Sequence, residues 1–206
     1  MKVLLVNGSP NKEGCTHTAL CEIESALVSD GIEAEIFHIG TGPVRGCVAC
    51  GKCEEIGKCV FDDDVCRELT EKIEAADGVI IGSPVYFSGP NGALCALLDR
   101  VFFSSMGKFR HKLAAAVVSC RRGGASAAFD RLNKYFTISQ MPVVSSQYWN
   151  SVHGFTPDDV RRDLEGLQTM RTLGRNMAWL LKNIEAGNPP PTPESERMFT
   201  SFPDGK

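Results

Sequence analysis

The sequence lacks any long apolar run, and no stretch approaches the roughly 20 residues that a membrane-spanning helix needs. The apolar start, residues 1–6, is too short for a secretory signal and leads directly into a polar turn. Basic residues are not in excess, since 22 Lys and Arg stand against 25 Asp and Glu, which gives a formal net charge of −3. We therefore expect a cytoplasmic protein that binds neither nucleic acid nor membrane.

Cysteine, in contrast, is abundant, with nine residues in a chain of 206. Because no secretory signal is expected, we also expect these thiols to meet a reducing cytosol, where thiols bind metals or react instead of forming cross-links. Four of them share the compact spacing C-x2-C-x2-C-x5-C, namely Cys47, Cys50, Cys53 and Cys59. Runs of C-x2-C-x2-C are typical of iron–sulfur sites, whereas zinc sites more often pair two separated C-x2-C knuckles. Three interpretations stay open: a four-iron, four-sulfur (4Fe-4S) cluster, a reduced loop without metal, and a zinc site.

Short apolar runs alternate with helical patterns along the chain, which predicts a parallel sheet covered by helices on both faces. The strands expected from these runs are residues 2–6, 32–39, 79–81, 113–118 and 142–144. One expected helix carries Leu20, Ile23 and Leu27 and ends at residues 30–31, and another follows the cap at residues 62–64 with Val65, Leu69 and Ile73 on one face. The other expected helices occupy residues 91–104, a stretch from the glycines at 123–124 to about residue 138, and residues 158–185. We expect one domain over residues 1–185 and a Pro-rich tail over residues 186–206. The apolar tail residues Met198, Phe199 and Phe202 are expected to pack on the domain or on a partner subunit.

The loop after the first strand, residues 8–18, concentrates hydroxyl groups and backbone N–H groups at the start of a helix. Such a helix N-terminus binds anions. The loop is not a Walker loop, because no Gly-Lys-Ser/Thr closes it, and it also lacks the G-x-G-x-x-G pattern of dinucleotide sites. A pocket for the phosphate of a mononucleotide is therefore favoured.

These loops resemble those of a known family, the flavodoxin-like NAD(P)H-dependent FMN reductases. Residues 7–10, Asn-Gly-Ser-Pro, followed by Gly-Cys-Thr at 14–16, resemble the phosphate loop of the family. Residues 82–89 resemble its second flavin loop, and the match in order and spacing extends over residues 1–185. The four cysteines after the second strand are similar to the compact motif of the iron–sulfur flavoproteins. One departure is Cys15, where relatives commonly have Asn, but a backbone N–H contact survives that change.

The resemblance implies a flavodoxin-like three-layer α/β/α fold with a five-stranded parallel sheet in the order 2-1-3-4-5. It implies that the FMN phosphate is held by Ser9, Cys15, Thr16 and Thr18. It also implies that the ribityl chain and isoalloxazine ring lie along Pro84, Val85, Tyr86 and Phe87. For the two aromatic residues, ordinary core packing is the alternative.

A third loop, residues 119–124, is expected to meet the other edge of the flavin ring, through Ser119, Arg121 and Gly123. Either Arg121 or Arg122 would stabilise a reduced flavin or hold a nicotinamide-nucleotide phosphate. The alternative for these two arginines is a solvated surface pair.

The leading functional hypothesis is an FMN-dependent oxidoreductase with NAD(P)H as co-substrate and a quinone, free flavin, other small molecule or redox protein as electron acceptor. The flavin carries this chemistry, so no catalytic side chain is expected. One alternative is an iron–sulfur flavoprotein that carries electrons between FMN and a 4Fe-4S cluster, and another is a non-catalytic module with a zinc loop. The resemblance also implies a homodimer or homotetramer, with Trp149 as a candidate contact.

Overall fold

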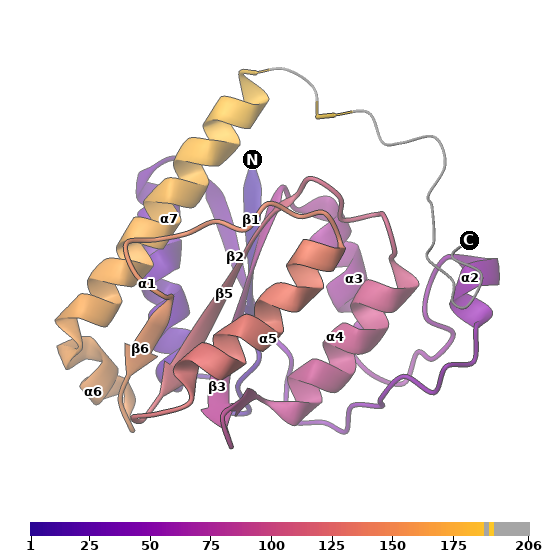
Figure 1. The fold of residues 1–206 in the computed structure, drawn as a ribbon, viewed down its shortest axis with the longest axis horizontal. Helices are drawn as coiled ribbons and strands as arrows, with labels where there is room; N and C mark the ends of the chain where they lie inside the picture. The colour runs from indigo at the N-terminus through magenta and orange to yellow at the C-terminus, as the bar shows by residue number, and fades with distance from the viewer. Residues whose placement is uncertain (188–189, 192–206) are drawn as a thin grey trace, which may run out of the picture.

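Five parallel strands form the centre of the computed structural model, which describes residues 1–187 and 190–191 (Figure 1). They are β1 (Lys2–Asn7), β2 (Glu33–His38), β3 (Gly78–Tyr86), β5 (Leu113–Cys120) and β6 (Ser151–His153). Their order is β2-β1-β3-β5-β6, which confirms the expected order 2-1-3-4-5. The two-residue strand β4 (Gly89–Pro90) pairs antiparallel with β3 off this path, so the sheet has six strands instead of five.

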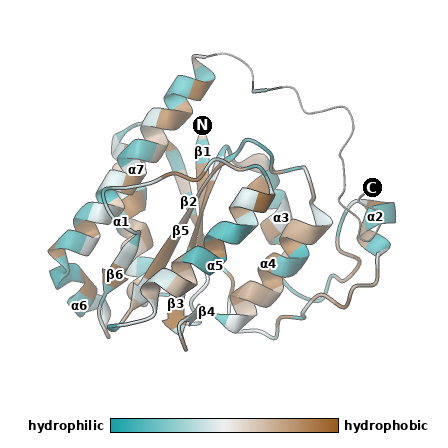
Figure 2. Cartoon of the chain, in the orientation of Figure 1, coloured by the Kyte–Doolittle hydropathy of each residue, from teal (hydrophilic) through white to brown (hydrophobic). Residues whose placement is uncertain are grey.

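Helices cover both faces of the sheet, as expected for buried parallel strands. One face carries α1 (Cys15–Ser29), α6 (Pro157–Arg162) and α7 (Leu164–Glu185). The other carries α3 (Cys66–Ala75), α4 (Gly92–Ser104) and α5 (Ala125–Ile138), while the short α2 (Lys52–Ile56) lies beyond α4. Figure 2 shows hydrophobic central strands between helices that carry many hydrophilic residues. In the described part of the chain, no helix is both long enough and apolar enough to span a bilayer.

Two expected elements differ in the structure. The expected strand at residues 142–144 forms only an isolated bridge between Val143 and Ala114, and β6 takes the fifth position instead. Around this bridge the Pro142 carbonyl oxygen accepts from the Ala114 N–H at 2.9 Å, and the Val144 N–H donates to the Ala114 carbonyl oxygen at 2.8 Å. Pro142 itself has no N–H to donate, so the pairing does not extend past it. The expected final helix is divided at Asp163, whose ψ of 77° is not helical and whose side chain caps α7 through the Gly166 N–H at 2.9 Å.

The register of the parallel strands brings three loops to one edge of the sheet. Asn7 at the end of β1 pairs with Gly82 in β3, and Pro84 in β3 pairs with Ser119 in β5. The loops that follow these strands therefore meet at the carboxyl edge, where ligands bind in open α/β sheets.

Candidate functional site

The loop after β1 is organised by the buried side chain of Asn7. Its Oδ1 accepts from the Ser9 N–H at 3.1 Å, and its Nδ2 donates to the Lys12 carbonyl oxygen at 3.0 Å. The Ser9 hydroxyl oxygen accepts from the Asn11 N–H at 3.1 Å. His38 Nε2 lies 2.8 Å from the Ser9 carbonyl oxygen. These bonds fold the loop back on itself directly before α1.

The first turn of α1 presents backbone N–H groups that have no partner within the helix. The N-cap, Gly14, makes no side-chain cap bond, and the first intrahelical bond runs from the Thr18 N–H to the Gly14 carbonyl oxygen at 3.0 Å. The N–H groups of residues 15–17 lie before this first bond and so have no acceptor within the helix. A Cβ on Gly14 would lie 2.9 Å from Asn11 Cβ, so the close turn favours glycine. This helix N-terminus has the donors and the dipole that bind an anion.

The predicted phosphate residues lie together around this turn. Thr16 and Ser9 are buried, and Thr16 Oγ1 lies 2.8 Å from Ser119 Oγ, which joins the first loop to the third. Thr18 donates its hydroxyl to the Gly14 carbonyl oxygen at 3.2 Å, and the Cys15 thiol donates to the Gly154 carbonyl oxygen at 3.9 Å. Burial raises the pKa of Cys15, so its thiol is neutral at neutral pH.

The loop after β3 is a tight hairpin that projects from the sheet. Tyr86 pairs with Gly89 across it, and the two central residues, Phe87 and Ser88, have φ of 50° and 62°. Two positive φ values match the turn that hairpins of this length prefer, although glycine and asparagine usually occupy it. Phe87 is fully exposed and Tyr86 is 44% exposed, so ordinary core packing was the wrong alternative for both. A positive φ strains the backbone of a residue other than glycine, and such strain is often found at functional sites.

Asn91, which sequence reasoning did not single out, ties the hairpin to the first loop. Its Nδ2 donates to the Gly8 carbonyl oxygen at 2.7 Å, and its N–H donates to Ser83 Oγ at 2.9 Å. Its Oδ1 caps α4 by accepting from the Ala93 N–H at 3.1 Å. The available signal was an asparagine at the first position of the predicted helix 91–104, since asparagine is a common residue at a helix N-cap.

The third loop packs against the hairpin. Ser119 is buried, whereas Arg121, Arg122 and Gly123 are exposed. A Cβ on the next residue, Gly124, would lie 2.8 Å from Ser88 Cα. Neither arginine forms an ion pair with another described residue, so both guanidinium groups are available to a ligand.

The predicted cysteine ligands lie apart from these three loops, in the segment between β2 and α3. Cys47 and Cys50 are exposed, Cys53 and Cys59 are half-buried, and all four line one small cavity of about 30 Å³. That volume holds about one water molecule. Within residues 1–187 and 190–191, no three residues of metal-binding type are arranged to hold a metal ion.

Arg100 on α4 joins both ends of the cysteine segment. The residue is 2% exposed, and its Nη1 donates to the Arg45 carbonyl oxygen at 3.2 Å while its Nη2 donates to that of Phe61 at 3.3 Å. Nε donates to Cys59 Sγ at 3.3 Å, and Nη1 also forms an ion pair with the buried Asp64. Burial alone would lower the pKa of Arg100, because it disfavours the charged guanidinium. The hydrogen bonds to Cys59 and Asp64 outweigh this effect, so the pKa of Arg100 is raised.

The chemistry of the side chains around the small cavity fits an anionic iron–sulfur group. Four thiols share the cavity with the Arg100 guanidinium and with Ser104, whose buried hydroxyl has no partner among the described residues. Cationic and hydroxyl donors of this kind hydrogen-bond the sulfurs of a cluster. Cys66 is close by, but burial raises its pKa to about 12, so this thiol is protonated at neutral pH and is a poor ligand.

Comparison with known proteins places these features in a family. The family model described as NADPH-dependent FMN reductase matches residues 1–156. An iron-sulfur flavoprotein of Methanocaldococcus jannaschii is 36% identical over 193 residues, which cover 90% of this chain and 100% of that protein. An iron-sulfur flavoprotein of Methanosarcina thermophila is 31% identical over 190 residues, covering 90% of this chain and 97% of that protein.

The fold is also similar to solved flavodoxin-like structures. A flavodoxin, WrbA-like protein from Agrobacterium tumefaciens superposes with a TM-score of 0.61 at 17% identity, over 88% of this chain and 96% of that one. This likeness confirms the expected flavodoxin-like fold.

The buried ion pair of Arg100 generates a stability prediction. Replacing Arg100 with Met leaves the Asp64 carboxylate buried without its partner, so the free energy of unfolding should fall by about 3–5 kcal/mol. Adding Asp64→Asn removes the stranded charge and should recover part of the loss. The control is Arg161→Met, which breaks an exposed pair with Asp158 and should cost less than about 1 kcal/mol. Equal losses for Arg100→Met and Arg161→Met in urea titrations would contradict the prediction.

Proposed function

The chain belongs to the NADPH-dependent FMN reductase family, and on this premise we propose that it uses FMN to pass electrons from NAD(P)H to a small-molecule acceptor. The observation that carries the proposal is the meeting of three loops at one edge of the sheet. The bare amides of α1, the exposed hairpin at Tyr86–Phe87 and the loop at residues 119–124 lie there together. Quinones and free flavins are the acceptors that we favour.

The first loop would hold the FMN phosphate mainly through backbone N–H groups of the first turn of α1, with the Ser9 hydroxyl beside them. Thr16 and Ser119 share one hydrogen bond between their hydroxyls. Two hydroxyls bring two protons to that pair, so one proton is left to donate to a phosphate oxygen. The Thr18 hydroxyl already donates to the Gly14 carbonyl oxygen, so its role would be to shape the turn. Cys15 would contact the phosphate through its backbone N–H.

The hairpin would lie along the flavin, with residues 84–87 beside the ribityl chain and the ring. Bound FMN supplies the hydride and electron transfer, so the protein needs no acid–base side chain. The exposed Tyr86 and Phe87 offer aromatic surface, while the paired backbone of Val85 keeps their positions defined. Arg121 would face the phosphate or the nicotinamide-nucleotide charge of the incoming co-substrate, because its guanidinium is exposed and unpaired within the described chain.

A negative charge introduced in the first turn of α1 tests the phosphate site. His17→Glu places a carboxylate where helices favour negative charge, so folding should be preserved, but the carboxylate repels a phosphate. We expect FMN affinity to fall about tenfold or more in a fluorescence titration of apoprotein. The control His17→Gln, similar in size and uncharged, should bind like the wild type. The same affinity for the Glu and Gln variants would exclude this turn as the phosphate site.

A second candidate function is that of an electron carrier that contains a 4Fe-4S cluster in addition to FMN. It is favoured by the four thiols around one cavity, by the Arg100 and Ser104 donors, and by the two iron-sulfur flavoproteins that the chain resembles. The cluster would be held by Cys47, Cys50, Cys53 and Cys59. Because the cavity is smaller than a cluster, the exposed part of the loop would have to move outward to admit one.

Anaerobic purification tests this second function. We expect about four iron and four sulfide per chain in the wild type, and loss of both in Cys50→Ser with FMN retained. The flavin loops are separate from the cysteine segment, so the yellow colour should persist. Cys95→Ser, on α4 outside the segment, is the control and should keep its iron. Anaerobic wild-type protein that lacks iron, or that holds zinc instead, would exclude the cluster.

We also propose that the protein is a homodimer or homotetramer. Tyr148 and Trp149 form an exposed aromatic pair, with side chains 59% and 58% accessible and ring centroids 5.1 Å apart. Aromatic residues of this kind are enriched at interfaces. The apolar tail residues 198–202, also proposed as contacts, lie outside the described residues.

Sedimentation of the FMN-loaded protein at micromolar concentration should give at least twice the 22.4 kDa of one chain. Trp149→Ser should weaken the assembly, whereas Trp179→Ser, an equally exposed position on α7, should leave it unchanged. A wild-type protein that sediments only as a monomer would refute the assembly.

A further inference from the structure

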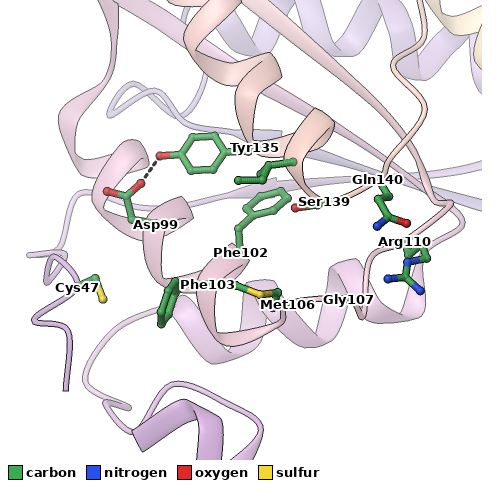
Figure 3. Close-up of a pocket in the computed structure, with 11 residues that line it drawn as sticks. Cys47, Asp99, Phe102, Phe103, Met106, Gly107, Arg110, Tyr135, Ser139 and Gln140 are labelled. Carbon is green, nitrogen blue, oxygen red and sulfur yellow. Dashed lines mark hydrogen bonds between the residues drawn. The ribbon is translucent and has the colours of Figure 1, made fainter. Parts of the chain in front are cut away.

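A cavity of about 550 Å³ lies between the C-terminal halves of α4 and α5, away from the three loops (Figure 3). Its volume is in the range of small-molecule sites. The walls are mainly aromatic and aliphatic, formed by Phe102, Phe103, Met106, Tyr135 and Ile138. We name this cavity the aromatic slot.

One end of the aromatic slot carries an uncompensated positive charge. Arg110 and Gln140 lie there on the same side of the slot in Figure 3. Arg110 Nε is buried without a hydrogen-bond partner in the described chain, and no described acidic side chain pairs with this guanidinium. A buried donor without an acceptor costs free energy, which a bound acceptor would recover.

The acidic group of the slot, Asp99, is already compensated. The Tyr135 hydroxyl donates to Asp99 Oδ1 at 2.5 Å, and Arg131 Nη2 donates to the same oxygen at 3.3 Å. The Arg131 guanidinium also lies over the Tyr135 ring, 4.4 Å from its centroid. These contacts hold the Tyr135 ring in place as one wall of the slot. Because Asp99 is neutralised by Arg131, the positive charge of Arg110 is the one left, among the described residues of the slot, to act on a ligand.

The aromatic slot adjoins the cysteine segment and is distant from the proposed FMN phosphate site. Cys47 and Phe103 line both the slot and the small cysteine cavity. The flavin loops meet α4 at its first residue, Gly92, whereas Phe103 lies eleven residues later. At 1.5 Å per residue this is roughly 16 Å along the helix axis.

We propose that the aromatic slot binds a planar aromatic carboxylate or similar aromatic anion, at a second site separate from that of FMN. The fixed ring of Tyr135 and the side chains of Phe102 and Phe103 suit stacking and edge contacts with a flat ring. The Arg110 guanidinium matches the geometry of a carboxylate. The binding of this ligand does not rest on the proposed function.

The probe is 2-naphthoate, a planar anion without redox chemistry, titrated calorimetrically into the FMN-loaded full chain. We expect a dissociation constant below about 1 mM for the wild type. Arg110→Met keeps most of the side-chain length but removes the charge, and it should weaken binding at least tenfold.

Matched substitutions at exposed positions keep the test independent of folding. Ile138 lines the slot and is 77% exposed, while Leu164 on α7 is 74% exposed and lies elsewhere. Ile138→Glu should weaken naphthoate binding and Ile138→Lys should strengthen it, because they place opposite charges beside an anion. Leu164→Glu should have no effect.

Three results would overturn the proposal: equal affinity in wild type and Arg110→Met, competition between naphthoate and added FMN in apoprotein, or binding that appears only after residues 188–206 are removed. The last result would assign the slot to the C-terminal segment of this chain. A failure of the proposed reductase function would appear instead as absent NAD(P)H oxidation, with the naphthoate titration unchanged.

Discussion

The close approach of Gly8 and Gly82 is the contact on which the arrangement of the flavin loops depends. The Gly8 N–H donates to the Gly82 carbonyl oxygen at 2.9 Å, and a Cβ on Gly8 would lie 2.5 Å from Leu94 Cδ2. A Cβ on Gly82 would lie 2.8 Å from Thr16 Cγ2. Only residues without a side chain allow the ends of β1 and β3, the start of α1 and the first turns of α4 to meet at one point.

Helix α4 links the three candidate sites of the molecule. Asn91 caps it at the flavin loops, Arg100 joins it to the cysteine segment, and Phe103 forms a wall of the aromatic slot. A helix is stiff over this length, so Asn91 and Arg100 are held about 13 Å apart along its axis. The flavin loops and the cysteine segment share no loop, so this helix fixes their separation.

Most of the fold could be predicted from the sequence, because continuous apolar runs such as residues 2–6 have few alternatives to a buried strand. The predictions failed where a local sequence pattern disagreed with the strand pairing or helix capping that the folded chain adopts. The apolar residues at 142–144 resemble a strand, but Pro142 cannot donate and the sheet continues through β6. The helical pattern from residue 158 onward concealed Asp163, whose backbone N–H ends α6 and whose side chain caps α7.

The sequence by itself determined the features that depend on neighbouring residues: the helix N-terminus after Gly14, the spacing of the four cysteines, and the loops that end the strands. Only the tertiary structure decided which distant groups meet. Asn91 bonds to Gly8 across 83 positions, and Arg100 bonds to Arg45 across 55 and to Cys59 across 41. No local pattern encodes such partners, because a long polar side chain has many possible acceptors until the packing of the sheet and helices excludes water and leaves it few.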